Sequence, residues 1–322
     1  MKITIIGCGR WGSLITWYLS EKKGLDTCLY GRSDSAHMQR FLSERRNDLL
    51  TLPDSVALST NLVQATTWAD VIIISIGAQG LRDLIGELAP LGLKNKTVVL
   101  CMKGLEASTG KRLSEIAAEG LDPSMKIAVW VGPGHVQEFY AGIPNCMVID
   151  SNDADTRQWL VESFSSELIR FYYGEDLLGS EIGAAAKNVI GIAAGMLDGR
   201  GLSTLKGALM SRGTREIARL IAAMGGNELS AYGLCHLGDY EATVFSKFSH
   251  NRAFGEAFIT GKPFEALAEG YATVKALVLL GQQYNVELPI CTAVYNILYE
   301  NADAAAQLQY LFTRRIRSEF YM

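Results

Sequence analysis

Lys187 is the residue of this chain whose surroundings most strongly suggest chemistry. It lies in the stretch 183–195, GAAAKNVIGIAAG, whose small and apolar residues are typical of a closely packed, buried helix. Burial lowers the pKa of a lysine, which prepares its ammonium group to act as a general acid or base near neutral pH. A lysine that snorkels out of a surface helix gives a similar local sequence, so the catalytic interpretation is a hypothesis.

Two further places carry polar side chains in an apolar setting. Lys103, in CMKG, follows a predicted strand at its carboxyl end, where open α/β sheets bind ligands. The stretch 237–254 gathers an acid, hydroxyls, an amide and cations, namely Asp239, Thr243, Ser249, His250, Asn251 and Arg252. These groups could form a pocket for a small polar anion, although a surface loop has the same composition. Lone histidines are more often structural, so His37 and His236 are set aside.

The first dozen residues, which read KITIIGCGRWG from Lys2, must position a different ligand. An apolar β-branched run leads into Gly7, Gly9 and Gly12, spaced as GxGxxG, and then into a helical pattern over 13–19. In this spacing the first glycine allows a tight turn, the second lets the backbone approach a pyrophosphate, and the third lets the helix pack close to the strand. The helix N-terminus then faces the phosphates. The stretch predicts dinucleotide binding.

Arg32 bears on which dinucleotide is bound. The second predicted strand, 27–30, is followed by Gly31 and Arg32, where an NAD-binding chain would carry an acid for the ribose. A guanidinium pairs with a 2′-phosphate, so NADPH is favoured over NADH. Asp34, two residues further on, is an acid that could bind the ribose of NAD, so NAD is the alternative cofactor. For Arg32 itself, the alternative interpretation is a solvated side chain in a loop.

Strands and helices alternate through the first half of the chain. Apolar runs at 71–76, 97–101 and 126–131 are typical of strands buried on both faces of a parallel sheet, with helical patterns between them at 81–88 and 110–119. Strands at 146–149 and 169–173 flank a predicted helix over 155–167. Gly132, Pro133 and Gly134 follow a strand at the expected ligand edge and offer backbone N–H groups, with His135 next.

From Gly179 onward the apolar residues recur at helical spacing, and β-branched runs disappear. The sequence therefore predicts two domains, a dinucleotide-binding domain over 1–176 and an all-helical catalytic and substrate domain over 177–322.

Composition excludes several classes of protein. The 322 residues carry a net charge of −4 without a block of like charges, so neither nucleic acid nor an anionic membrane is expected as a partner. The six cysteines are scattered singly, without metal-ligand spacing, which predicts reduced thiols and no metal site. No apolar stretch reaches the roughly 18 residues that span a bilayer. A cytoplasmic location is expected.

Eight motifs, in order along nearly the whole chain, give it a family resemblance. It resembles the NAD(P)-dependent sn-glycerol-3-phosphate dehydrogenases. The matching pieces are GCGRWG at Gly7, MKGLE at Met102, GPGHVQEF at Gly132, KNVIGIAAGMLDG at Lys187, GLCHLGDYEAT at Gly233, SHNRAFG at Ser249, EG at Glu269 and VELPI at Val286. The resemblance implies an α/β Rossmann-like N-terminal domain with a parallel sheet, followed by an all-α C-terminal domain.

The resemblance also implies an activity and roles for residues. The enzymes of the family interconvert dihydroxyacetone phosphate and sn-glycerol 3-phosphate, with NADP, or possibly NAD, as cofactor. Lys187 would be the general acid/base, Asp239 its partner, and Lys103 a cation at the catalytic site. Substrate contacts would come from Lys103, Gly132, Gly134, Thr243, Ser249, His250 and Asn251. Cofactor contacts would come from Gly7, Gly9, Arg10, Trp11, Gly12, Arg32, Lys103, Val136, His250 and Glu269. A homodimer is expected.

Two departures from the family pattern fall in the implied substrate pocket. GPGH stands where the family usually has GPSF, which places Gly134 and His135 there, and SHN stands where it has SRN, which places His250 at the expected phosphate clamp. Histidine is only partly charged at neutral pH and lacks the bidentate fork of arginine. Arg252 does not compensate, since the family commonly has a cation there too.

These departures leave alternatives open. Dihydroxyacetone phosphate is the first choice of substrate. The same chemistry on another small phosphorylated, phosphonate or carboxylate hydroxyketone, in a specialised pathway, is the second. A catalytically silent NAD(P)H-binding sensor is the third, and the presence of Lys103, Lys187, Asp239 and Asn251 argues against it.

Overall fold

The computed structural model describes residues 1–316, 318 and 319, and it divides into two compact units. The first comprises Met1–Met102 and Leu113–Leu177, and the second comprises Lys103–Arg112 and the chain from Leu178 onward. The predicted single cut between 176 and 177 differs from this division in two respects: the boundary falls one residue later, and the segment 103–112 belongs to the helical unit. The segment 103–112 groups with the helical unit because Leu105, within it, is fully buried in that unit's core.

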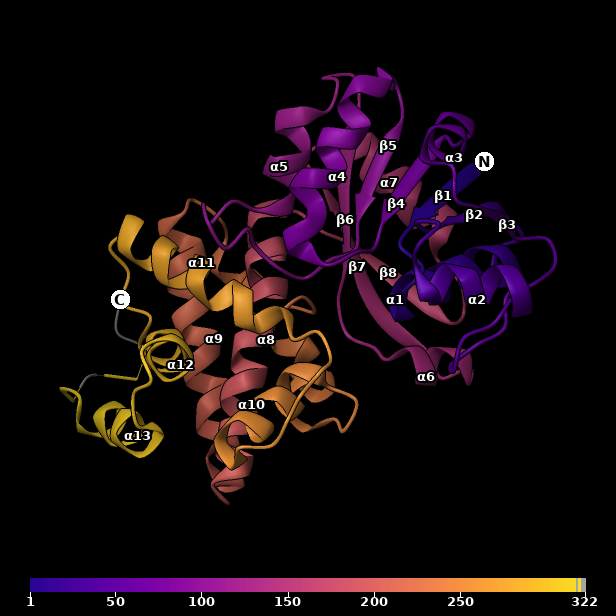
Figure 1. Ribbon diagram of the computed structural model, residues 1–322. Coiled ribbons are helices and arrows are strands. Elements are labelled where there is room, and N and C mark those ends of the chain that lie inside the picture. Colours follow the sequence, from indigo (N-terminus) through magenta and orange to yellow (C-terminus); the bar gives the residue numbers. More distant parts are fainter. Residues whose placement is uncertain (317, 320–322) are drawn as a thin grey trace. The chain divides into compact units, whose positions relative to one another are not determined.

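The first unit is built on one eight-stranded sheet (Figure 1), in the order β3-β2-β1-β4-β5-β6-β7-β8. The strands are β1 (Lys2–Ile6), β2 (Asp26–Tyr30), β3 (Ala57–Ser59), β4 (Val71–Ile74), β5 (Thr97–Leu100), β6 (Lys126–Val131), β7 (Asn145–Ser151) and β8 (Ile169–Tyr173). Its helices are α1 (Arg10–Trp17), α2 (Ala36–Glu44), α3 (Leu62–Trp68), α4 (Leu81–Leu88), α5 (Leu113–Gly120), α6 (Val136–Tyr140) and α7 (Ala154–Phe164). The predicted Rossmann-like class is confirmed.

The sequence predicts a parallel sheet, and the structure differs from this prediction at one pair of strands. β6 and β7 pair antiparallel, whereas β7 and β8 pair parallel to each other. The helix between β6 and β7, α6, has five residues and rises about 7.5 Å, which is too short to return the chain along a strand of about 20 Å. The chain therefore reverses instead of crossing over.

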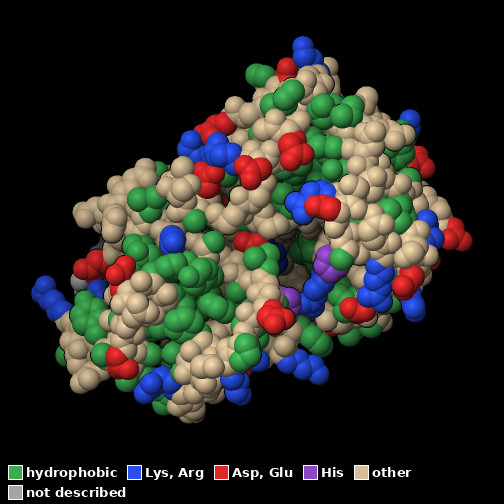
Figure 2. Space-filling view, viewed as in Figure 1, with side chains coloured by type: hydrophobic (Ala, Val, Ile, Leu, Met, Phe, Trp, Pro, Cys, Tyr) green, Lys and Arg blue, Asp and Glu red, His purple; other side chains and the backbone are tan. Residues whose placement is uncertain are grey.

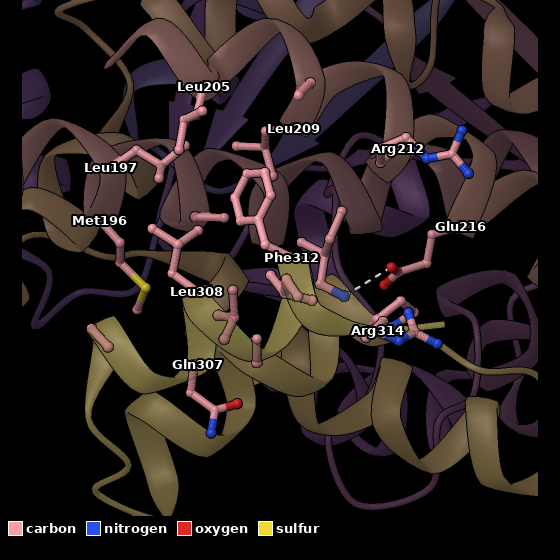
Figure 3. A pocket seen from close by; sticks show the side chains of 18 of the residues that line it. Met196, Leu197, Leu205, Leu209, Arg212, Glu216, Gln307, Leu308, Phe312 and Arg314 are labelled. Carbon is pink, nitrogen blue, oxygen red and sulfur yellow. Dashed lines mark hydrogen bonds between the residues drawn. The ribbon is translucent and has the colours of Figure 1, made fainter. Parts of the chain in front are cut away.

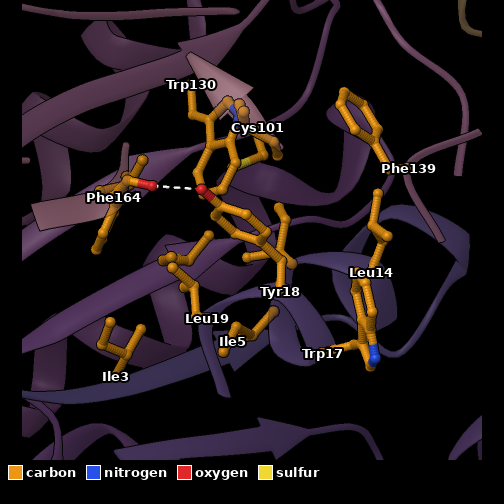
Figure 4. Packing of buried hydrophobic residues seen from close by; sticks show 14 of the residues in the cluster. Ile3, Ile5, Leu14, Trp17, Tyr18, Leu19, Cys101, Trp130, Phe139 and Phe164 are labelled. Carbon is orange, nitrogen blue, oxygen red and sulfur yellow. Dashed lines mark hydrogen bonds between the residues drawn. The ribbon is translucent and has the colours of Figure 1, made fainter. Parts of the chain in front are cut away.

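Helices cover both faces of the sheet because side chains alternate along each strand. Ile3 and Ile5 pack into a cluster with residues of α1, α2 and α7, whereas Thr4 points to the other face and donates a hydrogen bond to Ala65 O of α3, at 2.7 Å. Figure 4 shows the first cluster, in which Tyr18 lies beside Trp130 and donates to Phe164 O.

The second unit is built from helices, as predicted. They are α8 (Leu177–Gly199), α9 (Lys206–Ala223), α10 (His250–Thr260), α11 (Glu269–Gln283), α12 (Pro289–Tyr299) and α13 (Ala304–Thr313). Two short helical segments lead into α10, the 3-10 turn η6 (Leu237–Asp239) and the π turn η7 (Glu241–Phe245).

The small residues of α8 let the helix pack closely against its neighbour α10, as the sequence predicts. A Cβ added to Gly195 would lie 1.9 Å from Arg252 O, and one added to Gly255 would lie 2.1 Å from Ile192 O. The backbones of α8 and α10 therefore approach each other more closely than any larger side chain permits. Residues 182–194 of α8 are almost entirely buried.

Over the residues that the structure describes, no helix is long and apolar enough to cross a bilayer, and no group of three or more His, Cys, Asp or Glu side chains is placed to hold a metal ion. Figure 2 shows hydrophobic side chains gathered over the helical unit, on the lower left of the view.

Candidate functional site

Two lysines share one buried carboxylate oxygen in the helical unit. Lys187 Nζ and Lys103 Nζ each lie 2.8 Å from Oδ2 of Asp239. Lys187 Nζ also donates to Thr243 Oγ1 at 2.8 Å. Asp239 is fully buried, and its second oxygen, Oδ1, has no hydrogen-bond partner among the residues that the structure describes. The group carries two ammonium charges against one carboxylate.

Three regions far apart in sequence bring these side chains together. Lys187 lies in the middle of α8, Asp239 is the last residue of η6, and Thr243 lies in η7. Lys103 is the first residue of the segment 103–112, which comes from the N-terminal half of the chain but belongs to the helical unit. Gly191 keeps η7 close to α8, because a Cβ there would lie 2.7 Å from Thr243 Cγ2. Lys103, Lys187, Asp239 and Thr243 therefore form one cluster.

The burial of Lys187 changes its protonation equilibrium. Burial lowers the pKa of Lys187 to about 8, and the nearby charge of Lys103 adds to this, while Asp239 opposes it. At neutral pH the ammonium form still predominates, so Lys187 can donate a proton. A modest rise in pH releases the amine, which can accept one.

His236, which the sequence analysis set aside, holds the turn that carries Asp239. Its Nδ1 lies 2.8 Å from Gly183 O, and its Nε2 lies 2.6 Å from the Tyr240 hydroxyl. Because a carbonyl oxygen only accepts, Nδ1 carries the hydrogen and Nε2 accepts from Tyr240. Burial lowers the pKa of His236 to about 4, so the ring is neutral and serves to join α8 to the turn.

Asn188, the neighbour of Lys187, is a residue of the site that the sequence analysis did not include. The signal that could have identified it is its position directly after Lys187 in the motif KNV. Its Nδ2 donates to Lys103 O at 2.6 Å, and its Oδ1 accepts from Asn251 Nδ2 at 2.9 Å. Asn251 Oδ1 accepts in turn from the backbone N–H of Gly270, at 2.9 Å. The chain of amides fixes Lys103 relative to α8, α10 and α11.

The remaining predicted residues of this unit lie at helix starts. Ser249 caps α10 by accepting from the Arg252 N–H, and His250 is the first residue of the helix, half-buried and edge-on to Phe264. Glu269 is the first residue of α11. The Arg252 guanidinium donates to Asp198 at 2.8 Å and to Glu256 at 3.0 Å. Arg252 is therefore held by carboxylates of its own unit.

In the sheet unit, the three glycines of GxGxxG occupy three different environments. Gly7 has φ +115°, and a Cβ there would lie 2.2 Å from Ser75 O. A Cβ on Gly12 would lie 1.9 Å from Gly7 O, whereas one on Gly9 would meet no described heavy atom within 4 Å beyond its chain neighbours. Gly9 is the N-cap of α1 and cannot cap it with a side chain. The open space at Gly9, in front of a helix N-terminus, fits a dinucleotide pyrophosphate.

The other predicted cofactor and substrate residues of the sheet unit surround the starts of α1 and α6. Trp11 packs on Phe139, with ring centroids 6.1 Å apart, and its Nε1 is buried without a described partner. Arg10 donates to Gln137 at 3.4 Å, and Val136 begins α6 and is buried. Gly132 and Gly134 have φ +130° and +139°, conformations that glycine adopts without strain.

A side chain at position 134 has no room. A Cβ on Gly134 would lie 2.2 Å from the Phe139 ring, so the glycine found where the family usually has serine matches this local packing. Arg32 follows β2 with its side chain 78% exposed, and its Nε lies 3.2 Å from Asp34 Oδ1.

The lysine cluster and the glycine-rich turn thus lie in different units, one in each.

Family models match both parts of the chain. The model described as NAD-dependent glycerol-3-phosphate dehydrogenase N-terminus matches residues 2–157, and the one described as NAD-dependent glycerol-3-phosphate dehydrogenase C-terminus matches residues 176–309.

Individual relatives match along their whole length. An NAD(P)+ glycerol-3-phosphate dehydrogenase of Prosthecochloris aestuarii is 36% identical, with 99% of this chain and 100% of the relative covered. One of Exiguobacterium is 34% identical, with 99% and 97% covered. The crystal structure of glycerol-3-phosphate dehydrogenase from Coxiella burnetii superposes with a TM-score of 0.91 at 27% identity, covering 97% of this chain and 99% of that one.

Proposed function

Because the chain belongs to the NAD-dependent glycerol-3-phosphate dehydrogenase family, we propose that it transfers a hydride between NAD(P)H and dihydroxyacetone phosphate, giving sn-glycerol 3-phosphate. The observation that carries this proposal is the shared contact of Lys187 and Lys103 with Asp239 Oδ2 in a buried site. An acid with a pKa of about 8 next to a second cation suits the reduction of a ketone that bears a phosphate.

Lys187 is the proposed general acid/base. In the reduction it donates a proton from Nζ to the oxygen of the ketone, where negative charge develops as the hydride arrives. In the reverse direction the neutral amine takes the proton of the substrate hydroxyl. Asp239 and Thr243 hold Nζ in place through contacts of 2.8 Å each. A bound nicotinamide supplies or accepts the hydride.

Lys103 and the unused oxygen of Asp239 are the proposed substrate contacts of the cluster. The excess ammonium charge attracts a phosphorylated substrate. Asp239 Oδ1 is buried and has no described partner, a state that costs free energy until a donor binds. A substrate hydroxyl supplies such a donor. Asn251, tied to Asn188 at 2.9 Å, borders the same elements and is proposed as a further contact.

For the cofactor we propose NADP, with NAD also accepted. The open backbone at Gly9 and the tight packing at Gly7 and Gly12 support a pyrophosphate at the start of α1. The guanidinium of Arg32 is exposed and can turn to a 2′-phosphate. Asp34, its present partner, would repel that phosphate, which leaves NAD as an alternative.

A second candidate substrate is favoured by one observation at α10. His250 stands where the family usually has an arginine, and the next guanidinium, that of Arg252, is held by Asp198 and Glu256. A weaker phosphate clamp suits a different small phosphorylated, phosphonate or carboxylate hydroxyketone, reduced by the same chemistry. A binding-only role fits poorly, since a cofactor sensor has no use for the lysine cluster.

The test is the oxidation of NADPH and of NADH, followed at 340 nm with dihydroxyacetone phosphate. We expect turnover with a KM between about 1 μM and 1 mM. Folded protein that binds NADPH but does not turn over dihydroxyacetone phosphate contradicts the first candidate. Turnover of another hydroxyketone in the same assay would then support the second, and none with any of them would support a sensor.

We also propose a homodimer and a cytoplasmic location. All six cysteines are free thiols, the state that a reducing compartment maintains. The mass of the protein in solution, measured by light scattering, tests the dimer.

A further inference from the structure

Thr243, the neighbour of Lys187 Nζ, lies in the π turn η7, and Lys206 holds the carboxyl end of that turn. Lys206 is the first residue of α9, is buried, and donates from Nζ to Val244 O at 3.1 Å. Its Nζ also lies 5.3 Å from the centre of the Phe245 ring. Val244 and Phe245 are the last two residues of η7, where backbone oxygens lack partners within a helical turn. Lys206 therefore joins α9 to the turn directly after Thr243.

Arg252, on α10, holds the residue that follows. Its Nε donates to Ser246 O at 3.2 Å, and Ser246 is the C-cap of η7. Lysine and arginine side chains commonly bind the last carbonyl oxygens of a helix in this way. Two cations from different helices, Lys206 of α9 and Arg252 of α10, therefore hold the carboxyl end of η7.

Asp198, near the end of α8, binds both cations through one oxygen. Its Oδ2 lies 2.6 Å from Lys206 Nζ and 2.8 Å from Arg252 Nη1. Its other oxygen, Oδ1, accepts from the Ser203 hydroxyl at 2.6 Å. Burial opposes ionisation, but the hydrogen bonds from these three groups outweigh burial and lower the pKa of Asp198 below its ordinary value. Asp198 is therefore a carboxylate at neutral pH, and it connects α8 to both donors of η7.

The opposite side of α8 faces a cavity of about 590 Å³ (Figure 3). Met196, two residues before Asp198, is buried and lines this cavity. Two residues turn a helix by about 200°, so the two side chains point to opposite sides of α8. Truncation of Met196 therefore disturbs the packing of the unit on the side away from Asp198, which makes it a matched structural control.

We propose that Asp198 is a positioning residue for the reaction. It fixes η7 through Lys206 and Arg252. The turn in this place keeps the Thr243 hydroxyl 2.8 Å from Lys187 Nζ, where it accepts a hydrogen bond from the ammonium group. Desolvation offsets much of the attraction within a buried ion network, so the role of this one is in geometry more than in net stability. The proposal rests on the proposed role of Lys187 as the general acid/base.

The test compares the titration of Lys187 in the wild type and in Asp198→Asn. Only the neutral amine of a lysine reacts with acetic anhydride. The rate of acetylation of Lys187 between pH 6 and 10, measured on the full chain by mass spectrometry of its peptides, therefore gives the pKa without any need for activity. The other titratable groups near Lys187 are unchanged in the variant, namely Lys103, Asp239 and His236.

Asp198→Asn should lower the pKa of Lys187 by about one unit, the worth of one hydrogen bond to a charged group, because the ammonium form loses an acceptor when Thr243 moves away. It should also lower kcat for dihydroxyacetone phosphate at least tenfold, because the proton donor is misplaced. The KM for NADPH should stay within a few-fold of the wild type, since the glycine-rich turn is untouched.

Two variants show whether the effect passes through the turn. Lys206→Met removes the donor to Val244 O but leaves Asp198 paired with Arg252, so the pKa of Lys187 should fall by a smaller amount in a chain that keeps its fold. Thr243→Val has a similar shape and lacks the hydroxyl. Asp198→Asn added to Thr243→Val should cause no further fall, because both changes act on the same hydrogen bond.

Two other variants are controls. Glu256→Gln removes the exposed carboxylate that lies 3.0 Å from Arg252 and should leave the titration of Lys187 and kcat unchanged. Met196→Ala should lower Tm by several °C, because a buried side chain is truncated, and should also leave the titration unchanged.

Three results would overturn the proposal. They are a wild-type titration of Lys187 in Asp198→Asn and Lys206→Met, an equal shift in Met196→Ala, and additive shifts in the double variant with Thr243→Val. If Asp198→Asn does not fold, the titration in Lys206→Met decides. Absence of turnover by the wild type contradicts the proposed function instead, and acetylation still shows whether Asp198 acts on Lys187.

Discussion

The glycine-rich turn and the lysine cluster are made in opposite ways. The turn occupies six consecutive positions, 7–12. Its first glycine packs against Ser75 and its third against Gly7, whereas the second, Gly9, faces open space. The cluster draws Lys103, Lys187, Asp239 and Thr243 from segments as much as 140 residues apart along the chain. A cofactor site of the first kind can be read from spacing, whereas a catalytic site of the second kind exists only after folding.

The largest expected effect breaks the cluster. Lys187→Ala removes the proton donor and should lower kcat by roughly 10²–10⁴-fold, with NADPH affinity near that of the wild type, because the glycine-rich turn is untouched. Steady-state kinetics and NADPH titration measure the two effects. Lys275→Ala, at an exposed position of α11, is the control. Activity of Lys187→Ala within a few-fold of the wild type would remove Lys187 from this role.

Breaking the turn should separate folding from binding. Gly12→Ala places a Cβ 1.9 Å from Gly7 O and should cost about 1–3 kcal/mol of stability, measured as a fall of several °C in Tm. Gly9→Ala meets open space, so its Tm should stay unchanged while its affinity for NADPH falls at least tenfold. The assignment of the pyrophosphate to Gly9 is wrong if Gly9→Ala binds NADPH as the wild type does.

The pH dependence of the two reaction directions sharpens the account of the cluster. Reduction needs protonated Lys187, whose pKa is lowered to about 8, so kcat/KM for dihydroxyacetone phosphate should fall about tenfold per pH unit above pH 8. Oxidation needs the neutral amine and should rise with pH up to the same value. Profiles of both directions between pH 6 and 10 test this. Parallel profiles would contradict a single lysine acid/base.

His250→Arg tests the departure at α10. A guanidinium there should lower the KM for dihydroxyacetone phosphate by about tenfold, the worth of one charge-assisted hydrogen bond. His250→Gln, which adds no charge, is the matched control. An unchanged KM in His250→Arg would mean that the histidine does not weaken a phosphate clamp.

The smallest expected effect concerns the choice of cofactor. Arg32→Ala should weaken NADPH several-fold and leave NADH unchanged, because the exposed guanidinium contributes to the 2′-phosphate alone. Asp34→Asn breaks the same ion pair from the other side and should not weaken NADPH. Equal losses for both cofactors in Arg32→Ala would contradict the 2′-phosphate contact.

Much of the fold could be predicted because its signals are local. The buried strands β4, β5 and β6 are continuous apolar runs, and α4 has the bounds 81–88 that its pattern predicts. The stretch 31–70 carried no such signal. β3 in that stretch has three residues and half-exposed side chains, so its pattern is too short to indicate a strand. The reversal at β7 was also beyond the pattern, since strand direction depends on the path of the loop.

The sequence by itself determined the glycine spacing, the alternation of strands and helices, and the identity of the residues that could do chemistry. The tertiary structure alone decided that Lys103 leaves the sheet unit to join the helical one, and that Asp239 serves both lysines through one oxygen. It also gave the set-aside His236 its role in holding the turn. The physical reason is the distance along the chain over which each property is determined. Backbone conformation follows from neighbours along the chain, whereas the pKa of a buried lysine follows from whatever distant side chains the fold places beside it.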